Sequence, residues 1–281
     1  MNYKKGFKIK PLEVSQSGEV IFTDGTNKIV PNQLSCEAYG YKYNSDTSTC
    51  VAFDYNTKIQ GFFNNINNNQ LGADNKTERA TNKTLLNGTD NKTKGRNNNC
   101  FVNGRQHELT QGLNNTTILS GSFAQALNQG EVVIGGGGFG NTLALAQTSF
   151  IQQTGNTTDA TETSLFTQNI TNKFIEKVKN SVIGFEANVI GLNTGVGEGS
   201  AGQYGYVQIT GAVKFTNGLA STYHQSTTHI VQSGHSGMNI TAVMKDATAT
   251  SFGVAVTGLA ETYIQWTASI KLWQNKITQT F

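Results

Sequence analysis

The stretch Leu85-Leu-Asn-Gly-Thr-Asp-Asn-Lys-Thr-Lys-Gly95 opens a loose repeat. Its units end in glycine: Leu85-Leu-Asn-Gly88, Lys92-Thr-Lys-Gly95, Phe101-Val-Asn-Gly104, Leu109-Thr-Gln-Gly112, Ile118-Leu-Ser-Gly121, Leu127-Asn-Gln-Gly130 and Val132-Val-Ile-Gly135. Successive glycines are 7, 9, 8, 9, 9 and 5 residues apart, and the residue three positions earlier is apolar in every unit except that of Lys92. Units of this length match one strand and one tight turn, with Gly or Asn at a corner of positive φ. The pattern predicts a β-solenoid (a β-helix or β-roll) over residues 61–140.

Two such units would form one coil, so the stretch would hold roughly four coils and rise about 20 Å. One large apolar residue per short unit is too few to be buried inside a single narrow solenoid, whereas several chains around an axis would bury it. The sequence therefore predicts a homotrimer with five residues at its axis: Phe101, Leu109, Ile118, Leu127 and Val132. Disorder is the alternative for the Asn-rich part, residues 64–94.

The last part of the chain, residues 141–281, alternates apolar and polar residues in several runs. Clear examples are residues 181–190, 204–215, 252–257 and 263–273, with Gly and Asn turns between them. Several strands separated by such turns predict a C-terminal β-sandwich knob. Residues 166–178 also fit one amphipathic helix, but their Thr and Asn content favours short strands.

Residues 1–60 form a small N-terminal unit of β-hairpins. The turn Asp24-Gly-Thr-Asn27 separates two β-branched runs, and Cys36 and Cys50 flank a segment rich in aromatic residues. These cysteines could form a disulfide or hold a metal, but two packed thiols are the favoured interpretation. Three tyrosines of the segment either anchor an interface that attaches the protein to a larger particle or fill the unit's own core. They are Tyr39, Tyr41 and Tyr43.

Composition excludes several classes of protein. The 281 residues include 31 glycines, 2 prolines and 3 cysteines, and 21 Lys and Arg stand against 18 Asp and Glu, for a net charge of +3. So few basic residues form no stripe for nucleic acid. No run of about 18 apolar residues predicts a membrane-spanning helix, and the N-terminus lacks the apolar stretch of a signal peptide. We expect a protein made in the cytoplasm, without membrane insertion.

Candidate functional residues are few. The run Gly135-Gly-Gly-Gly-Phe-Gly140 matches a nucleotide-binding spacing but lacks the surrounding βαβ pattern, so no cofactor is expected. Histidines in a nearly uncharged stretch lack the spacing of a zinc site, although one histidine from each of three chains could hold an axial metal. Trp266 and Trp273 should lie on opposite faces of one strand, one in the core and one free for contacts. The candidates for receptor or axial contact are Tyr223, His224, His229, His235 and Trp273.

No pair of carboxylates suited to glycan cleavage and no nucleophile motif stands out. The sequence interpretation is therefore that the protein has no catalytic residues, is not an enzyme, and holds no resident metal.

The chain resembles a bacteriophage virion fibre. The resemblance rests on residues 181–191, 202–213 and 256–270, which are similar to a knob common at the C-termini of phage fibres, and on the glycine repeat, which is similar to trimeric β-roll stalks. Residues 36–50 also resemble N-terminal units of phage fibres. This resemblance implies an elongated all-β homotrimer on the virion surface. The N-terminus of the homotrimer would be anchored to a capsid protein. Its knob would adhere to a glycan or protein of the host surface. A tail fibre or receptor-binding protein of the tail is the main alternative, and a glycan-degrading tailspike is a further one.

Overall fold

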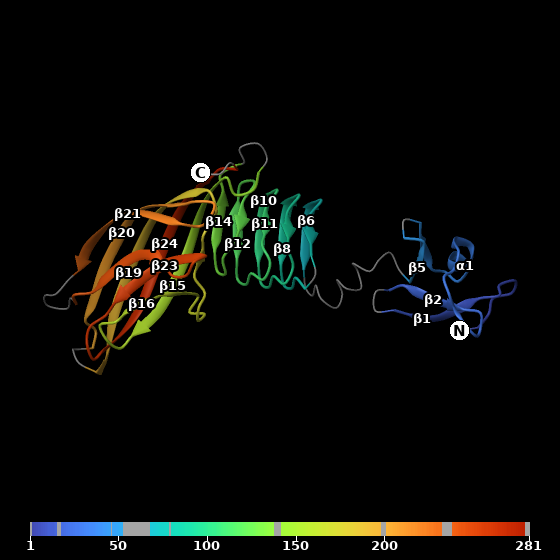
Figure 1. Ribbon diagram of the computed structural model, residues 1–281, viewed down its shortest axis with the longest axis horizontal. Coiled ribbons are helices and arrows are strands. Elements are labelled where there is room, and N and C mark those ends of the chain that lie inside the picture. The colour runs from blue at the N-terminus through green and yellow to red at the C-terminus, as the bar shows by residue number, and fades with distance from the viewer. Residues whose placement is uncertain are drawn as a thin grey trace. The chain divides into compact units, whose positions relative to one another are not determined.

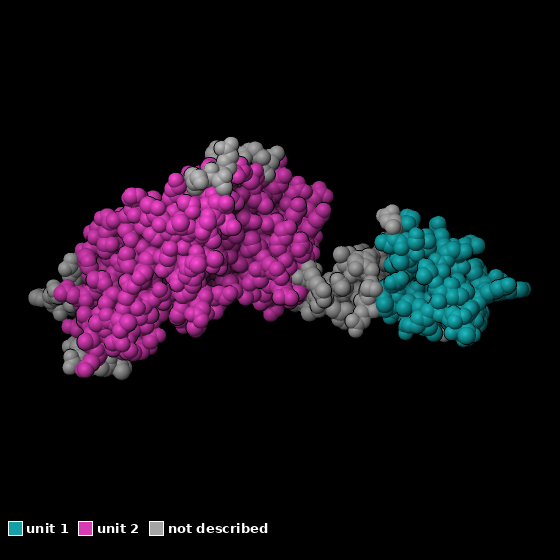
Figure 2. Space-filling model, viewed as in Figure 1, with its two compact units in different colours: residues 1–66 teal, residues 67–281 magenta. Residues whose placement is uncertain are grey.

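The computed structural model describes residues 2–15, 18–45, 47–52, 68–78, 80–137, 142–197, 201–231 and 238–278. The chain forms two compact units, residues 1–66 and 67–281 (Figures 1 and 2). Almost all regular structure is β-strand, as the sequence predicts, and the exception among the described residues is one short helix.

The first unit combines short strands with this helix. Its elements are β1 (Lys10–Val14), β2 (Val20–Thr23), β3 (Lys28–Ile29), α1 (Gln33–Ala38), β4 (Lys42–Asn44) and β5 (Thr49–Val51). Strands β1, β2 and β3 form an antiparallel sheet, and β4 and β5 form a hairpin. Helix α1 begins after Asn32, whose side chain accepts a hydrogen bond from the Ser35 N–H and so caps the helix. Phe22 is the largest fully buried side chain of the small core.

A disulfide joins Cys36 of α1 to Cys50 of β5. The sequence interpretation of two packed thiols is wrong here, because the fold brings their Cα atoms to 5.6 Å, within the range that a disulfide spans. Both cysteines are buried in the core of the unit, which contains few large apolar side chains. Cys100, in the second unit, is a buried free thiol.

The second unit begins with the predicted β-solenoid. Its strands are β6 (Asn69–Ala73), β7 (Lys76–Thr77), β8 (Leu85–Thr89), β9 (Lys92–Thr93), β10 (Phe101–Arg105), β11 (Glu108–Leu109), β12 (Thr117–Ser120), β13 (Gln125–Ala126) and β14 (Val132–Gly135). Asn69 pairs with Leu85, Leu85 with Phe101 and Phe101 with Thr117, so one coil takes sixteen residues. Successive coils stack as parallel strands in two sheets (Figure 1). The prediction of about four coils, each made of two units, is confirmed.

Glycine and asparagine ladders set the coil geometry. Gly72, Gly88, Gly104 and Gly121 stack at one corner, all with positive φ. Inside the next corner, the Asn75 side chain accepts a hydrogen bond from the Asn91 N–H, and the Asn91 side chain accepts one from the His107 N–H, each at 3.0 Å. We call the column Asn75, Asn91, His107 the internal ladder. It satisfies backbone N–H groups that the turns leave without a strand partner.

Apolar side chains fill the solenoid within one chain. Leu86, Val102 and Ile118 stack in one column, and Leu109 faces them from the second sheet; all are fully buried. This differs from the prediction that Leu109 and Ile118 face an axis between chains. A coil of sixteen residues encloses its own interior, so these side chains need no neighbouring chain for burial.

The antiparallel part of the second unit follows directly. Its strands are β15 (Ala146–Thr157), β16 (Glu162–Ser164), β17 (Phe166–Thr167), β18 (Ile175–Glu176), β19 (Ser181–Gly197), β20 (Tyr204–Phe215), β21 (Ser221–Val231), β22 (Thr241–Asp246), β23 (Ser251–Thr257) and β24 (Thr262–Lys276). The segment 166–178 contains the short strands β17 and β18, as the sequence favours, rather than a helix.

One sheet runs through the whole second unit. Strand β14, in the last coil, pairs with β15, and the order continues through β24, β19 and β20 to β21 (Figure 1). A second sheet of β16, β23, β18 and β22 packs against its inner face, with Phe215 and Phe252 in ring contact at 5.1 Å between centroids. The sequence predicts a domain boundary at residue 140, whereas the solenoid and the antiparallel strands share a sheet and form one compact unit.

Candidate interaction surface

The large sheet has one buried face and one face without a described covering element. Along β19, Ile183, Phe185 and Val189 point into the core, while Val182, Glu186 and Ile190 point outward. The same alternation holds along β15, β20 and β24 because their paired residues share a face. We call the outward side of β15, β24, β19 and β20 the outer face.

A groove of about 510 Å³ crosses the outer face where β14, β15, β24 and β19 lie side by side. Its lining includes Val132, Phe150, Gln152, Glu186, Asn188 and Lys271. Phe150, Lys271 and Glu186 form one cross-strand row, since Phe150 pairs with Lys271 and Lys271 with Glu186. The groove thus combines an aromatic ring, one cation and one carboxylate with side-chain amides.

Lys271 lies between two aromatic side chains. Its ammonium group is 4.7 Å from the ring centre of Trp273 and 5.8 Å from that of Phe150, which are cation–π distances. On the neighbouring strands, the Glu186 carboxylate accepts hydrogen bonds from the Asn188 and Gln208 amides, and the Tyr206 hydroxyl donates to the Asn188 side chain at 2.7 Å. These contacts hold the polar groups of the groove in fixed positions.

Trp273, which the sequence singles out, lies beside this groove next to Lys271, and the sequence did not predict the aromatic and charged residues that line the groove. Trp266 is buried and donates its indole N–H to the Thr157 hydroxyl, while Trp273 is exposed, as alternation along β24 predicts. Phe150, Glu186 and Lys271 are far apart in the chain, and their strands give no sign of which rows they share. The adjacent outward pair Lys271 and Trp273 was the available signal.

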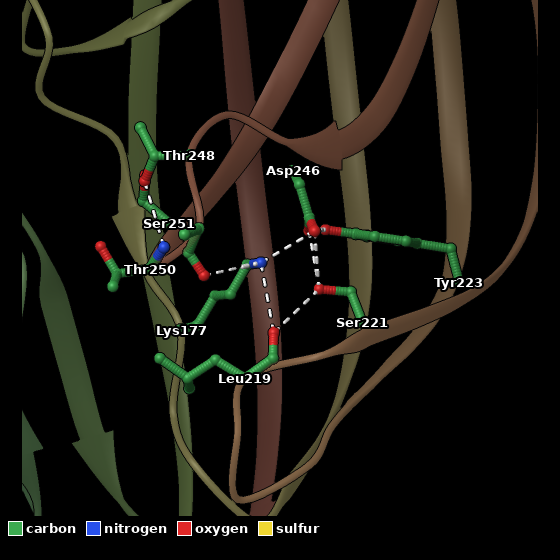
Figure 3. A network of polar contacts seen from close by, with 9 residues as sticks. Lys177, Leu219, Ser221, Tyr223, Asp246, Thr248, Thr250 and Ser251 are labelled. Atoms are coloured by element: carbon green, nitrogen blue, oxygen red, sulfur yellow. Dashed lines mark hydrogen bonds and ion pairs between the residues drawn. The ribbon is translucent and has the colours of Figure 1, made fainter.

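Tyr223 belongs to a different cluster, shown in Figure 3. Lys177, whose side chain is 2% exposed, forms an ion pair with Asp246 at 2.8 Å and also donates to the carbonyls of Leu219 and Ala249. Tyr223 and Ser221 donate hydroxyl hydrogen bonds to Asp246. Burial and the neighbouring carboxylate raise the pKa of Tyr223, and hydrogen bonds from Lys177, Tyr223 and Ser221 outweigh partial burial and lower the pKa of Asp246. All these groups bond to one another, so the cluster fastens β21 and β22 to the loops beside them.

His224 and His229 are exposed on β21, at the end of the strand order, and His235 lies outside the described residues. The described residues contain no group of three or more His, Cys, Asp or Glu placed to hold a metal ion. In the same part of the chain, no helix has the length and apolar character needed to cross a membrane.

The tyrosines of the first unit pack against that unit's own core. Tyr39 and Tyr41 make edge contacts with Phe22, and the Tyr39 hydroxyl donates to the Ile9 carbonyl at 2.9 Å. Tyr43 also packs against this core, and all three stay partly exposed. Among the residues predicted for a trimer axis, Phe101, Leu127 and Val132 are half-buried, and Val132 lines the groove.

No protein-family model matches the chain, and no curated protein matches it. The solved structures to which it is similar include three phage tailspike proteins. The tailspike protein gp49 from Acinetobacter baumannii bacteriophage Fri1, a capsular polysaccharide depolymerase, shares 9% identity over 74% of this chain, with a TM-score of 0.28. The Acinetobacter baumannii phage AM24 tailspike shares 8% over 75% of the chain (TM-score 0.26), and that of Acinetobacter phage vB_ApiP_P1 shares 7% over 74% (TM-score 0.20). The chain spans 45%, 49% and 45% of these proteins' lengths, respectively.

The prediction that the protein is not an enzyme is contradicted by this comparison, because one of the three tailspikes is a capsular polysaccharide depolymerase. We therefore withdraw it. TM-scores this low assign no activity to the chain itself. The three proteins do belong to the class that the sequence resemblance named, virion proteins of phages.

Proposed function

We propose that the chain is a fibre-like component of a phage virion that adheres to a polysaccharide of the host surface. In this proposal three chains assemble, the first unit attaches them to the virion, and the antiparallel end of the second unit acts as the knob. We take the tail as the attachment point, as for the tailspikes above, with the capsid as the alternative.

The observation that carries the proposal is the single sheet shared by the solenoid and the antiparallel strands. Every coil is bonded to the next, and the last coil is bonded to β15 along four residue pairs. A mechanical load at one end of this unit therefore passes through backbone hydrogen bonds. Such continuity suits a part that holds a contact surface away from a particle.

Host contact is assigned in this proposal to β21. The strand Ser221-Thr-Tyr-His-Gln-Ser-Thr-Thr-His-Ile-Val231 has no Lys, Arg, Asp or Glu, and most of its residues are exposed. Hydroxyl, amide and imidazole groups donate and accept hydrogen bonds, as sugar hydroxyls require of a partner.

We expect the double variant His224→Ala, His229→Ala to bind host cells roughly tenfold more weakly than the wild-type chain, since two exposed hydrogen-bonding side chains are lost. Binding of the labelled protein to host cells measures this. Gln111→Ala, which removes an exposed amide from the solenoid, is the control and should bind normally. Equal binding by all three proteins would remove β21 from the proposal. Incubation with isolated host polysaccharide, followed by sizing of the polysaccharide, tests cleavage separately.

Attachment is tested by deleting the first unit. Residues 1–66 form a compact unit of their own, so we expect a chain of residues 67–281 to stay folded and to be absent from purified virions. Circular dichroism checks the fold, and quantitative immunoblotting of particles checks incorporation. Normal copy number of the shortened chain on virions would show that attachment lies elsewhere.

A further inference from the structure

The outer face exposes large apolar side chains on all four of its strands. They are Phe150, Val182, Ile190, Leu192, Tyr204 and Trp273, each between 40% and 48% exposed. The registers join most of them into two groups. Phe150 lines the groove, and Trp273 lies next to it beside Lys271. Ile190 and Leu192 lie beside Tyr206 and Tyr204, nearer the β19–β20 turn. A large exposed apolar area of this kind marks an interaction site.

Charged groups are sparse on the same face. Its described outward positions include three charged side chains: Glu186, Lys214 and Lys271. Surfaces that bind proteins have few charges at their centre and are enriched in aromatic residues. The composition of the outer face therefore fits a protein partner.

We propose that the outer face is the surface through which copies of this chain associate. The inference deepens the proposed assembly of several chains by naming the surface that holds them together. This inference does not depend on the host molecule to which the assembled protein binds.

The size of the outer face suits a stable contact between copies. Four strands about 4.8 Å apart, each about 12 residues long at about 3.3 Å per residue, present roughly 750 Å². A standard protein interface buries about 800 Å² on each partner. The face is large enough to hold two chains together without help from the first unit.

Charge on the face also suits a second copy. Glu186 and Lys271 lie on adjacent strands in one row, so a copy related by a threefold axis can place its Lys271 near Glu186 of the first chain, and the same pairing repeats from chain to chain. Such pairing leaves neither charge buried without an opposite charge.

A polysaccharide is the competing occupant, since Phe150 and Trp273 could stack on sugar rings. A polysaccharide does not suit the whole face, because the face also exposes Val182, Ile190 and Leu192. Their aliphatic side chains offer no hydrogen bond to sugar hydroxyls, and Ile190 and Leu192 lie outside the groove. Apolar side chains of another copy would match them.

The test measures the mass of the full-length chain in solution. Light scattering coupled to size exclusion should give a multiple of 30.3 kDa for the wild-type protein. Ile190→Lys and Leu192→Lys, separately and together, place ammonium groups in the interface without touching the core. We expect the dissociation constant of the assembly to be roughly a hundredfold higher for the double variant than for the wild type.

Ile170→Lys is the matched control. Ile170 is 39% exposed in the loop after β17 and belongs to none of the four strands of the outer face, so this variant should keep the wild-type mass. Fluorescence of buried Trp266 confirms that each variant is folded.

Three outcomes would overturn the proposal. They are a wild-type chain that is monomeric at micromolar concentration, folded double variants with the wild-type mass, and equal dissociation by Ile170→Lys. If the wild-type chain is monomeric and the double variant loses binding to isolated host polysaccharide, the face belongs to the sugar instead. Binding to host cells is scored separately, so loss of adhesion alone leaves the mass result unaffected.

Discussion

Replacing Gly88 by alanine is expected to destabilise the second unit by about 4 kcal/mol or more, among the largest effects of a single substitution. A Cβ atom on Gly88 would lie 2.0 Å from the Gly104 carbonyl oxygen of the next coil. That oxygen belongs to the backbone and is held by the strand pairing of β8 with β10, so it cannot move away without breaking the stack. The positive φ of Gly88, +105°, adds strain of its own.

Gly112→Ala is the matched control for this substitution. Gly112 also has a positive φ, +80°, but a Cβ atom there would meet nothing within 4 Å. We expect it to cost about 1 kcal/mol, the strain of the backbone conformation alone. Urea unfolding followed by circular dichroism measures both variants. Equal losses of stability would show that the close stacking of Gly72, Gly88, Gly104 and Gly121 does not limit the coil.

The sequence predicts the solenoid because its glycines are visible in the repeat, but it does not reveal which apolar residues point inward. Leu85 and Phe101, each three residues before a glycine, pair on the outward side of the strands. Ile118 also precedes its glycine by three residues, yet it pairs with buried Val102 and points inward. Strand β12 contains one extra residue relative to β10, since Gly104 stacks on Gly121 while Val102 pairs with Ile118. A register shift of one residue turns a side chain to the other face of a sheet. Because the spacing of the repeat varies, the sequence does not show which apolar residues point into the solenoid.

The outer face could not be predicted from the sequence for a related reason. Alternation along residues 181–190 separates Ile183 and Phe185 from Val182 and Ile190, but large apolar residues occur in both sets. The pattern does not say which set another sheet covers. Predicting the groove also requires the register of β15 with β24 and of β24 with β19. These registers pair groove residues that are more than 80 positions apart in the chain. Pairing at such distances leaves no mark in local sequence.

Acid is expected to weaken the solenoid through His107, the second large effect that we predict. His107 is buried in the internal ladder, and its Nδ1 accepts a hydrogen bond from the Ala124 N–H at 3.0 Å. Its Nε2 completes no hydrogen bond, although the carbonyls of Asn103 and Gly121 oppose the fall in pKa. Burial dominates and lowers the pKa of His107 from 6.5 to about 4. A proton on Nδ1 would also face the Ala124 N–H, so protonation breaks this step of the ladder.

The sign of the effect follows from the two pKa values. Above pH 6.5 the imidazole is neutral in both the folded and the unfolded chain, and the full stability is present. As the pH falls from 6.5 toward 4, the unfolded chain binds a proton that the folded chain refuses, so the free energy of unfolding falls. The shift corresponds to about 3 kcal/mol once both states are protonated.

His107→Asn should remove this pH dependence and keep the fold. Asn91 occupies the same place one coil earlier, where its side chain accepts from the His107 N–H and donates to the carbonyls of Asn87 and Gly104. An asparagine at 107 can accept from the Ala124 N–H and donate to Asn103 and Gly121 in the same way. Asp90, Lys92 and Glu108 line the cavity beside His107 and are present in both proteins. Urea unfolding at pH 7.5, 6, 5 and 4 measures the difference. Parallel stability curves for the wild type and His107→Asn would show that His107 does not make the solenoid sensitive to acid, whereas a gap that widens below pH 6.5 identifies the internal ladder as the acid-sensitive part of the coil.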